Sequence, residues 1–335
     1  MSGLAARCFI VLSKLVYLVA DFEICSIFMG KGNTMKKWWI YQKERFPLLQ
    51  YIPMMIAFGF CAVSYSMHLD NPQAKFSDVK ISQYVVAIIT TLFWFMLLRI
   101  ADEHKDFKED SKYRAYRPVP RGLVTLKELR IIGVFLGLIQ VALSIWIDWR
   151  LLIMLALVYF WFTLMSLEFG VSKWLKARPT WYLVSHMIIM PFFDLYATSV
   201  EWIPRGGVFS FGILLYMISS FCDGTVVEVG RKLRAKENEE YGVDTYTQIW
   251  GPTRAMLAWM ICMSISGIST VLAGFQVRVG WEMMIILSPL YTYAVFIAVR
   301  FAKEPTSRNA KVFGVVPGVW ILVTYFMLGV MPFFK

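Results

Sequence analysis

The densest cluster of charge in the sequence lies between residues 102 and 121, in the stretch DEHKDFKEDSKYRAYRPVPR. Asp102, Asp106 and Asp110 follow one another at intervals of four residues, and Glu103 lies three residues before Asp106. If the preceding helix extends into this stretch, these carboxylates share one helical face. Clustered carboxylates suit a hard ion such as Mg²⁺, which takes a few protein oxygens and keeps positions for water and phosphate.

Basic residues follow these carboxylates in the chain. Arg117 and Arg121 are suited to donate forked hydrogen bonds to phosphate oxygens, and Lys112 is suited to act as a point charge. The stretch therefore predicts a site where Mg²⁺ bridges protein carboxylates to a diphosphate. Taken by itself, the stretch is equally compatible with a solvated loop of mixed charge.

A second segment with acidic and basic residues follows later in the chain. Asp223 is expected to close a helix, and Glu228 comes five residues later. That spacing does not place the two carboxylates on one helical face. Arg231 and Lys232 come next and are predicted to bind the same diphosphate.

Long apolar runs separate these charged segments. The chain has 335 residues, of which 58% are hydrophobic and only 17% charged, whereas soluble domains carry about 25% charged residues. Runs of about 20 apolar residues are typical of membrane-spanning helices. The sequence therefore predicts an all-α membrane protein with nine spans. The expected spans are residues 48–67, 82–101, 129–147, 151–169, 180–199, 207–222, 254–276, 282–300 and 313–332.

The net charge of +11 has a distribution typical of a membrane protein. Lysine and arginine concentrate in alternate loops, as the positive-inside rule describes, and this placement argues against nucleic acid as a partner. It predicts that the N-terminus and both charged segments face the cytoplasm, with a bacterial inner membrane as the favoured location. Residues 1–34 are predicted to be an N-terminal extension, and residues 35–335 the transmembrane domain.

One ionisable residue, Asp194, lies inside a predicted span, in the sequence PFFDLY. A carboxylate at membrane depth is costly and usually faces the interior of the helical bundle. Pro191, three residues earlier, is expected to open the helix locally. Asp194 is therefore predicted to line a cavity as a catalytic base or a contact for an acceptor. Pairing with an unidentified polar group is the structural alternative.

The stretch DEHKDFKED at residues 102–110 resembles the NDxxDxxxD signature of the UbiA-type intramembrane prenyltransferases, with Asp102 and Glu103 in place of the leading Asn-Asp. RPVPRG at residues 117–122 resembles the RPL-x-x-G segment that follows the signature. Nine helices, with acidic motifs after the second and the sixth, are also similar to the layout of that superfamily.

The resemblance implies a helical bundle around a central cavity that is open laterally to lipid. It also implies that two acidic loops hold Mg²⁺ and an isoprenyl diphosphate, and that an aromatic or other lipophilic acceptor attacks the allylic carbon. Arg117 would contact the diphosphate. The metal would lie among six carboxylates: Asp106 and Asp110 as ligands, Asp102 and Glu103 in support, and Asp223 and Glu228 at the second motif.

Two other functions stay open on the sequence. The second motif is Asp-x4-Glu, which departs from the expected DxxxD. Some proteins of this fold resemble terpene cyclases, in which a double bond of the substrate itself attacks the cation. A transporter would also have polybasic loops and many spans, but it needs no row of carboxylates in a loop. We predict a Mg²⁺-dependent prenyltransferase, with a terpene cyclase as the alternative.

Overall fold

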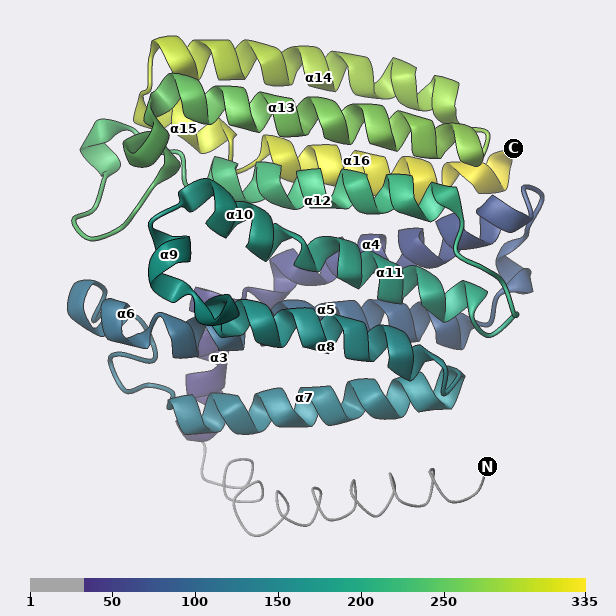
Figure 1. Ribbon diagram of the computed structural model, residues 1–335, viewed down its shortest axis with the longest axis horizontal. Helices are drawn as coiled ribbons and strands as arrows, with labels where there is room; N and C mark the ends of the chain where they lie inside the picture. Colours follow the sequence, from purple (N-terminus) through teal and green to yellow (C-terminus); the bar gives the residue numbers. More distant parts are fainter. Residues whose placement is uncertain (1–32) are drawn as a thin grey trace. The chain divides into compact units, whose positions relative to one another are not determined.

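The computed structural model describes residues 33–335, and every regular element in this range is helical. The predicted N-terminal extension, residues 1–34, lies almost wholly outside the described residues. Short 3-10 turns join some of the helices. The α-helices, numbered as in Figure 1, are α3 (Asn33–Arg45), α4 (Leu48–Asp70), α5 (Ile81–Lys105), α6 (Phe107–Tyr113), α7 (Leu126–Ile147), α8 (Leu151–Ser166), α9 (Ser172–Lys176), α10 (Pro179–Met187), α11 (Ile189–Trp202), α12 (Phe211–Arg231), α13 (Tyr246–Gln276), α14 (Gly280–Lys303), α15 (Ser307–Val312) and α16 (Val316–Gly329).

Within the described residues, eight helical segments are long and apolar enough to cross a membrane. This confirms the prediction of an all-α, multi-pass membrane protein. The remaining predicted span, 151–169, corresponds to α8, which has only 16 residues. A helix of that length rises about 24 Å, less than the hydrocarbon core of about 30 Å. It ends at Ser166 because Glu168 and Phe169 adopt positive φ angles, which do not continue a right-handed helix.

The described chain forms two compact units. The first contains residues 33–51 and 95–139, and therefore α3, the last part of α5, α6 and the first part of α7. The second contains residues 52–94 and 140–335, and therefore all the other helices. Helices α4, α5 and α7 each contribute residues to both units.

Helix α3 opens the first unit. This helix ends at Arg45, followed by Phe46 and Pro47, in agreement with the preference of the residue before a proline for extended backbone. Tyr41 of α3 and Phe46 are buried, as are Leu97 of α5 and Leu129 of α7. These side chains are among the buried apolar residues of the unit.

The second unit is a bundle of long helices. Helix α12 packs against α11 and α13, α13 packs against α14, and α11 packs against α8 (Figure 1). Helices α4 and α5 approach so closely that a Cβ added at Gly59 would lie 2.7 Å from the backbone nitrogen of Ile88. Only glycine permits that approach. The largest fully buried side chains of this unit include Trp94, Trp259, Trp320, Tyr65, Tyr196 and Tyr216.

The predicted span at 180–199 is divided into α10 and α11 at Ile188. Pro191 explains the position of this break. Proline provides no N–H for the carbonyl four residues earlier, and its ring clashes with that carbonyl, which here belongs to Met187. The helix is therefore interrupted one turn before Pro191, and Asp194 lies on the first turns of α11.

The prediction that Asp223 closes a helix is wrong. Helix α12 begins at Phe211, where the Ser210 side chain caps it by accepting a hydrogen bond from the Gly212 backbone N–H, and it continues to Arg231. No proline interrupts the sequence between these ends. Asp223 is therefore an interior helical residue, and the loop that follows begins only after Arg231.

Candidate active site

The carboxylates of the first motif lie on successive helical turns of the first unit. Asp102 belongs to the last turns of α5, Asp106 lies between α5 and α6, and Asp110 belongs to α6. The backbone N–H of Asp106 donates to the Asp102 carbonyl at 2.9 Å, and that of Asp110 donates to the Asp106 carbonyl at 2.8 Å. These bonds continue the helical pattern across the junction, so the three side chains follow one another along it.

Asp106 has the least compensated carboxylate of the three. Burial raises its pKa, and the neighbouring negative charge of Asp102 raises it further. Asp102 has a cationic neighbour, since one of its oxygens lies 3.3 Å from Arg99. Among residues 33–335, no hydrogen bond or ion pair reaches the Asp106 carboxylate. A cation placed beside Asp102 and Asp106 would relieve their repulsion.

Glu103 is held by two arginines. Its side chain is only 1% exposed, and one of its oxygens lies 2.5 Å from Nε of Arg45 and 3.5 Å from Nε of Arg99. Arg45 comes from α3 and Arg99 from α5, so this carboxylate ties the two helices together. The arrangement indicates that Glu103 positions the end of α5.

This arrangement predicts a large loss of stability in Glu103→Gln. Removing one partner of a buried ion pair leaves the other charges uncompensated and typically costs about 3–5 kcal/mol. We expect the free energy of unfolding in detergent to fall by about that amount, as measured by denaturant titration. The exposed residue Glu109 provides a control, because Glu109→Gln should change stability by less than about 0.5 kcal/mol. Equal stability of the two variants would contradict a positioning role for Glu103.

Asp110 is also engaged by two arginines. One of its oxygens lies 3.1 Å from Arg114 and the other 2.6 Å from Arg117, and its side chain is 2% exposed. The two guanidinium groups outnumber the single carboxylate, so this part of the loop keeps a net positive charge suited to a phosphate group. The structure thus places a carboxylate pair at Asp102 and Asp106, followed by an arginine-rich turn.

The other predicted phosphate-binding residues of the first motif also have neighbours. Arg121 lies 2.9 Å from Glu44 and donates to the Tyr116 carbonyl. The Lys112 ammonium lies 4.8 Å from the ring centre of Tyr113. Both side chains thus belong to the basic segment that follows the carboxylates.

The second motif lies in the second unit. Asp223 is buried, and it accepts hydrogen bonds from Ser266 at 2.6 Å and from Ser219 at 3.3 Å. Glu228 forms ion pairs with Arg231 and, at 2.8 Å, with Lys232. Asp223 therefore lies against α13, whereas Glu228 and its two cations are at the end of α12.

Asp194 is completely buried in the second unit. Neither of its carboxylate oxygens has a hydrogen-bond partner among the described residues. The Ser220 hydroxyl is its nearest polar neighbour, and the charge of Asp223 also acts on it. At hydrogen-bond distance, the hydroxyl groups of Ser220 and Tyr216 also lack partners in the described part of the chain. Buried polar groups normally find partners, so this group of side chains is suited to receive a polar group of a ligand.

Among residues 33–335, no three or more His, Cys, Asp or Glu side chains lie together in a way that could hold a metal ion by themselves. The donor set at Asp102 and Asp106 nevertheless fits Mg²⁺. This ion usually binds through one or two carboxylates and completes its coordination with water and substrate phosphates. The carboxylate of Asp106, which no ion pair or hydrogen bond reaches among residues 33–335, is the side chain best suited to such an ion.

The sequence predicted Arg117 as a site residue but missed Arg45, Arg99 and Arg114, which also engage the carboxylates of the first motif. Arg99 could have been found, since it precedes Asp102 by three residues and Glu103 by four, the spacing of neighbours on a helix. Arg114 could have been found in the same way, four residues after Asp110. Arg45 and Ser266 belong to distant parts of the sequence, and only the fold brings them to their carboxylates.

Comparison with known proteins identifies the family. A model described as the UbiA prenyltransferase family matches residues 72–324, which is most of the chain. The comparison with curated protein sequences found no match. The family model therefore shows the family membership of this chain, and the solved structures show similarity of fold.

Several solved structures share the fold. A digeranylgeranylglyceryl phosphate synthase has 14% identity and a TM-score of 0.57, with 90% of this chain and 100% of that chain covered. A UbiA homologue from Aeropyrum pernix K1 has 12% identity and a TM-score of 0.58, with 81% and 98% covered. A UbiA homologue from Archaeoglobus fulgidus, bound to DMAPP and Mg²⁺, has 13% identity and a TM-score of 0.51, with 84% and 98% covered.

Proposed function

Because this chain belongs to the UbiA prenyltransferase family, we propose that it is a Mg²⁺-dependent prenyltransferase that transfers the prenyl group of an isoprenyl diphosphate to a lipophilic acceptor within the membrane. The observation that carries this proposal is the first motif. There, the carboxylates of Asp102 and Asp106 precede a turn in which Arg114 and Arg117 flank Asp110. An A. fulgidus homologue binds an allylic diphosphate together with Mg²⁺.

The residues have distinct roles in the proposed site. Asp102 and Asp106 would hold Mg²⁺, and Arg114 and Arg117 would bind diphosphate oxygens through charge-assisted hydrogen bonds. When bound, Mg²⁺ neutralises the charge that develops on the leaving diphosphate. Asp110 and Glu103 hold the arginines and the helix end in place. In the second unit, Asp223 and Glu228 are proposed to bind metal, and Arg231 and Lys232 to bind diphosphate.

The reaction breaks the bond between the allylic carbon and the diphosphate oxygen, and the electron pair leaves with the diphosphate. The nucleophilic atom of the acceptor then forms a bond to the allylic carbon and loses a proton. We propose that an oxygen of Asp194 takes this proton, because its carboxylate is buried and has no hydrogen-bond partner among residues 33–335. General bases contribute about 100- to 10,000-fold to such reactions.

The charge pattern supports a proposal for the orientation in the membrane. The protein is an integral multi-pass membrane protein. We propose that both charged segments face the cytoplasm, since lysine and arginine concentrate in the corresponding loops, and that the membrane is a bacterial inner membrane. Residues 35–335 are proposed to be the catalytic domain and residues 1–34 an extension.

A terpene cyclase is the second candidate function. The observation that favours it is that Glu228 is paired with Arg231 and Lys232. The second motif therefore does not offer two unpaired carboxylates, and this is a departure from the expected motif. Buried aromatic rings of the second unit are also in contact. The centres of Phe58 and Tyr325 are 5.4 Å apart, and those of Tyr65 and Tyr216 are 5.5 Å apart. Ring faces can stabilise carbocations.

The role of the arginines can be tested with Arg117→Gln. Loss of a charge-assisted hydrogen bond to the diphosphate should raise KM for the isoprenyl diphosphate by about 10- to 100-fold. Arg114→Gln is the matched variant, because Arg114 also pairs with Asp110. Steady-state kinetics of the two variants distinguish the roles. Equal and small effects would mean that both arginines only hold Asp110.

The choice between transferase and cyclase requires product analysis. Membranes that contain the protein are incubated with Mg²⁺ and isoprenyl diphosphates of several chain lengths, with and without aromatic acceptors, and the extracted products are analysed by mass spectrometry. We expect a prenylated acceptor and almost no product in its absence. A cyclic hydrocarbon or alcohol formed without acceptor would contradict the transferase and support the cyclase.

A further inference from the structure

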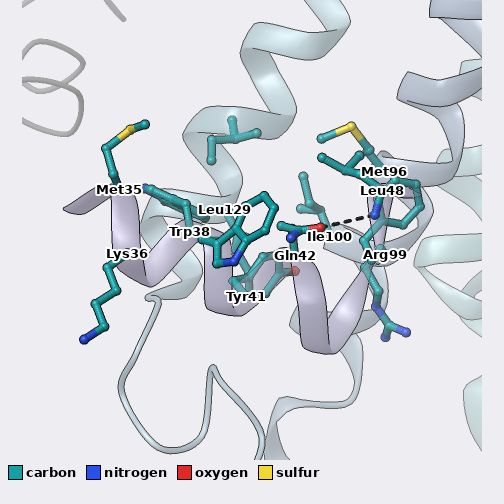
Figure 2. Close-up of a pocket in the computed structure, with 13 residues that line it drawn as sticks. Met35, Lys36, Trp38, Tyr41, Gln42, Leu48, Met96, Arg99, Ile100 and Leu129 are labelled. Carbon is teal, nitrogen blue, oxygen red and sulfur yellow. Dashed lines mark hydrogen bonds between the residues drawn. The ribbon is translucent and has the colours of Figure 1, made fainter. Parts of the chain in front are cut away.

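The first unit contains an apolar pocket with a volume of about 700 Å³. This volume is typical of a ligand site, for which the usual range is about 300–1,000 Å³. The residues that line it come from α3 and the segment after it, the end of α5 and the start of α7 (Figure 2). The pocket is open, since Met35 and Trp39 of its lining are exposed, and it has room for a ligand that arrives from outside the protein.

The lining of the pocket is apolar with polar groups at its edge. The ring of Trp38 lies in its centre, and Met35 and Met96 lie on one side (Figure 2). The side chains of Lys36 and Arg99 extend towards the opposite side (Figure 2). Water is disfavoured in an apolar cavity of this kind, whereas an amphipathic molecule would match both sides.

One buried polar atom of the pocket lining lacks a partner, and so does a second one nearby on α3. Tyr41 lines the pocket and is 8% exposed, and its hydroxyl has no hydrogen-bond partner among the described residues. One terminal nitrogen of Arg45, which is one turn further along α3 and does not line the pocket, also has no hydrogen-bond partner among the described residues. Both atoms are donors, so each would be satisfied by an acceptor oxygen on a ligand.

The charges around α3 indicate the sign of the ligand. Arg45 and Arg99 are compensated by Glu103 and Asp102, and Lys37 is compensated by Glu128. Lys36 and Lys43 have no ion pair in the described part of the chain. The surface of α3 therefore keeps a net positive charge, which favours an anionic head group.

The exposed residues of α3 and its surroundings indicate a membrane surface. Met35, Trp39 and Leu49 are 81%, 62% and 83% exposed, although all three are large and apolar. Tryptophan is enriched where membrane and water meet. A helix with exposed apolar side chains and lysines is typical of a segment that lies in the membrane interface.

From these observations we infer that the pocket formed by α3, α5 and α7 binds an anionic phospholipid, with an acyl chain against Trp38 and Ile132 and its phosphate near Tyr41 and Lys36. This site is distinct from the carboxylates of the first motif, and it does not depend on the proposed reaction. It is nevertheless linked to that motif through Arg99, which lines the pocket and pairs with Asp102 and Glu103.

The occupant can be identified by photocrosslinking. The full chain carries benzoylphenylalanine in place of Ile132, which lines the pocket, or in place of Val134, which is on the same helix, is 38% exposed and does not line it. Each protein is irradiated in liposomes made of equal amounts of phosphatidylglycerol and phosphatidylcholine. Intact-mass spectrometry then gives the ratio of the two lipid adducts.

We expect phosphatidylglycerol adducts to be enriched at position 132 at least about 5-fold relative to position 134, and the enrichment to fall in Tyr41→Phe. Equal ratios at the two positions would overturn the inference, because they would report bulk lipid only. Adducts at position 132 to other residues of this chain would also overturn it, since another segment would then fill the pocket.

A second measurement requires no photoreactive residue. Adding phosphatidylglycerol to protein in detergent should raise the thermal unfolding temperature of the unaltered chain, and of Val134→Trp, more than phosphatidylcholine does. In Ile132→Trp the indole fills the pocket, so the difference between the lipids should disappear. If the difference persists in Ile132→Trp, the lipid binds elsewhere and the inference is wrong.

Discussion

The Asp106→Asn variant is expected to release diphosphate from an isoprenyl diphosphate about 100- to 1,000-fold more slowly than the unaltered protein. Asp106 is the carboxylate of the first motif that no hydrogen bond or ion pair of the described residues engages. Its raised pKa reflects burial and the charge of Asp102. A neutral amide in its place would remove the strongest attraction for a cation at this site.

The stability of this variant should be unchanged or slightly higher, because the substitution removes repulsion from Asp102 and breaks no side-chain hydrogen bond seen in residues 33–335. Turnover is measured by diphosphate release, and folding by thermal unfolding of the purified protein. Glu109→Gln, three residues further along and exposed, is the matched control and should retain normal turnover. Near-normal turnover of Asp106→Asn would show that the metal is assigned to the wrong carboxylate.

The second large effect is expected at Asp194. Asp194→Asn should lower prenyl transfer about 100-fold or more, since the amide does not accept a proton from the acceptor. Its thermal stability should be unchanged or higher, because neither carboxylate oxygen has a hydrogen bond to lose among the described residues. Loss of activity without loss of stability would separate a catalytic role from a structural one.

Glu201 on the same helix is the control for this experiment. It is also buried, but it lies 2.5 Å from Arg205 and accepts a hydrogen bond from Ser66 at 2.7 Å. Glu201→Gln should therefore destabilise the protein by about 3–5 kcal/mol and leave the transfer rate of the folded fraction almost unchanged. If Asp194→Asn lost stability but kept its transfer rate, and Glu201→Gln did the reverse, the structural role would belong to Asp194.

The architecture could be predicted from the sequence because hydropathy is a local property. Runs such as 82–101 are long and apolar, and the corresponding helix, α5, extends to Lys105. The ends of helices were less predictable. Asp223 lies well inside α12 because a charged residue does not by itself stop a helix, and its carboxylate finds Ser219 and Ser266 instead of water.

The candidate site could be predicted only in part, because some of its features depend on neighbouring residues in the sequence and others depend on distant ones. The spacing of Asp102, Asp106 and Asp110 is local, so their order along the α5–α6 junction followed from helical geometry. The arginine partners of the carboxylates are not all local in the sequence. Glu103 depends on Arg45, 58 residues earlier in the chain, and this contact makes Glu103 a positioning residue. Family membership came from similarity spread over the whole span 72–324.

In the proposed reaction, the first motif uses a divalent metal to promote the loss of diphosphate. The most direct measurement is diphosphate release by the purified chain in liposomes, with isoprenyl diphosphate, an aromatic acceptor, and either Mg²⁺ or EDTA, followed by Mg²⁺ in excess of the chelator. We expect release with Mg²⁺, loss of release with EDTA, recovery after Mg²⁺ addition, and no such response in Asp106→Asn. Release that is equally fast in EDTA, or that is retained in Asp106→Asn, would contradict the account.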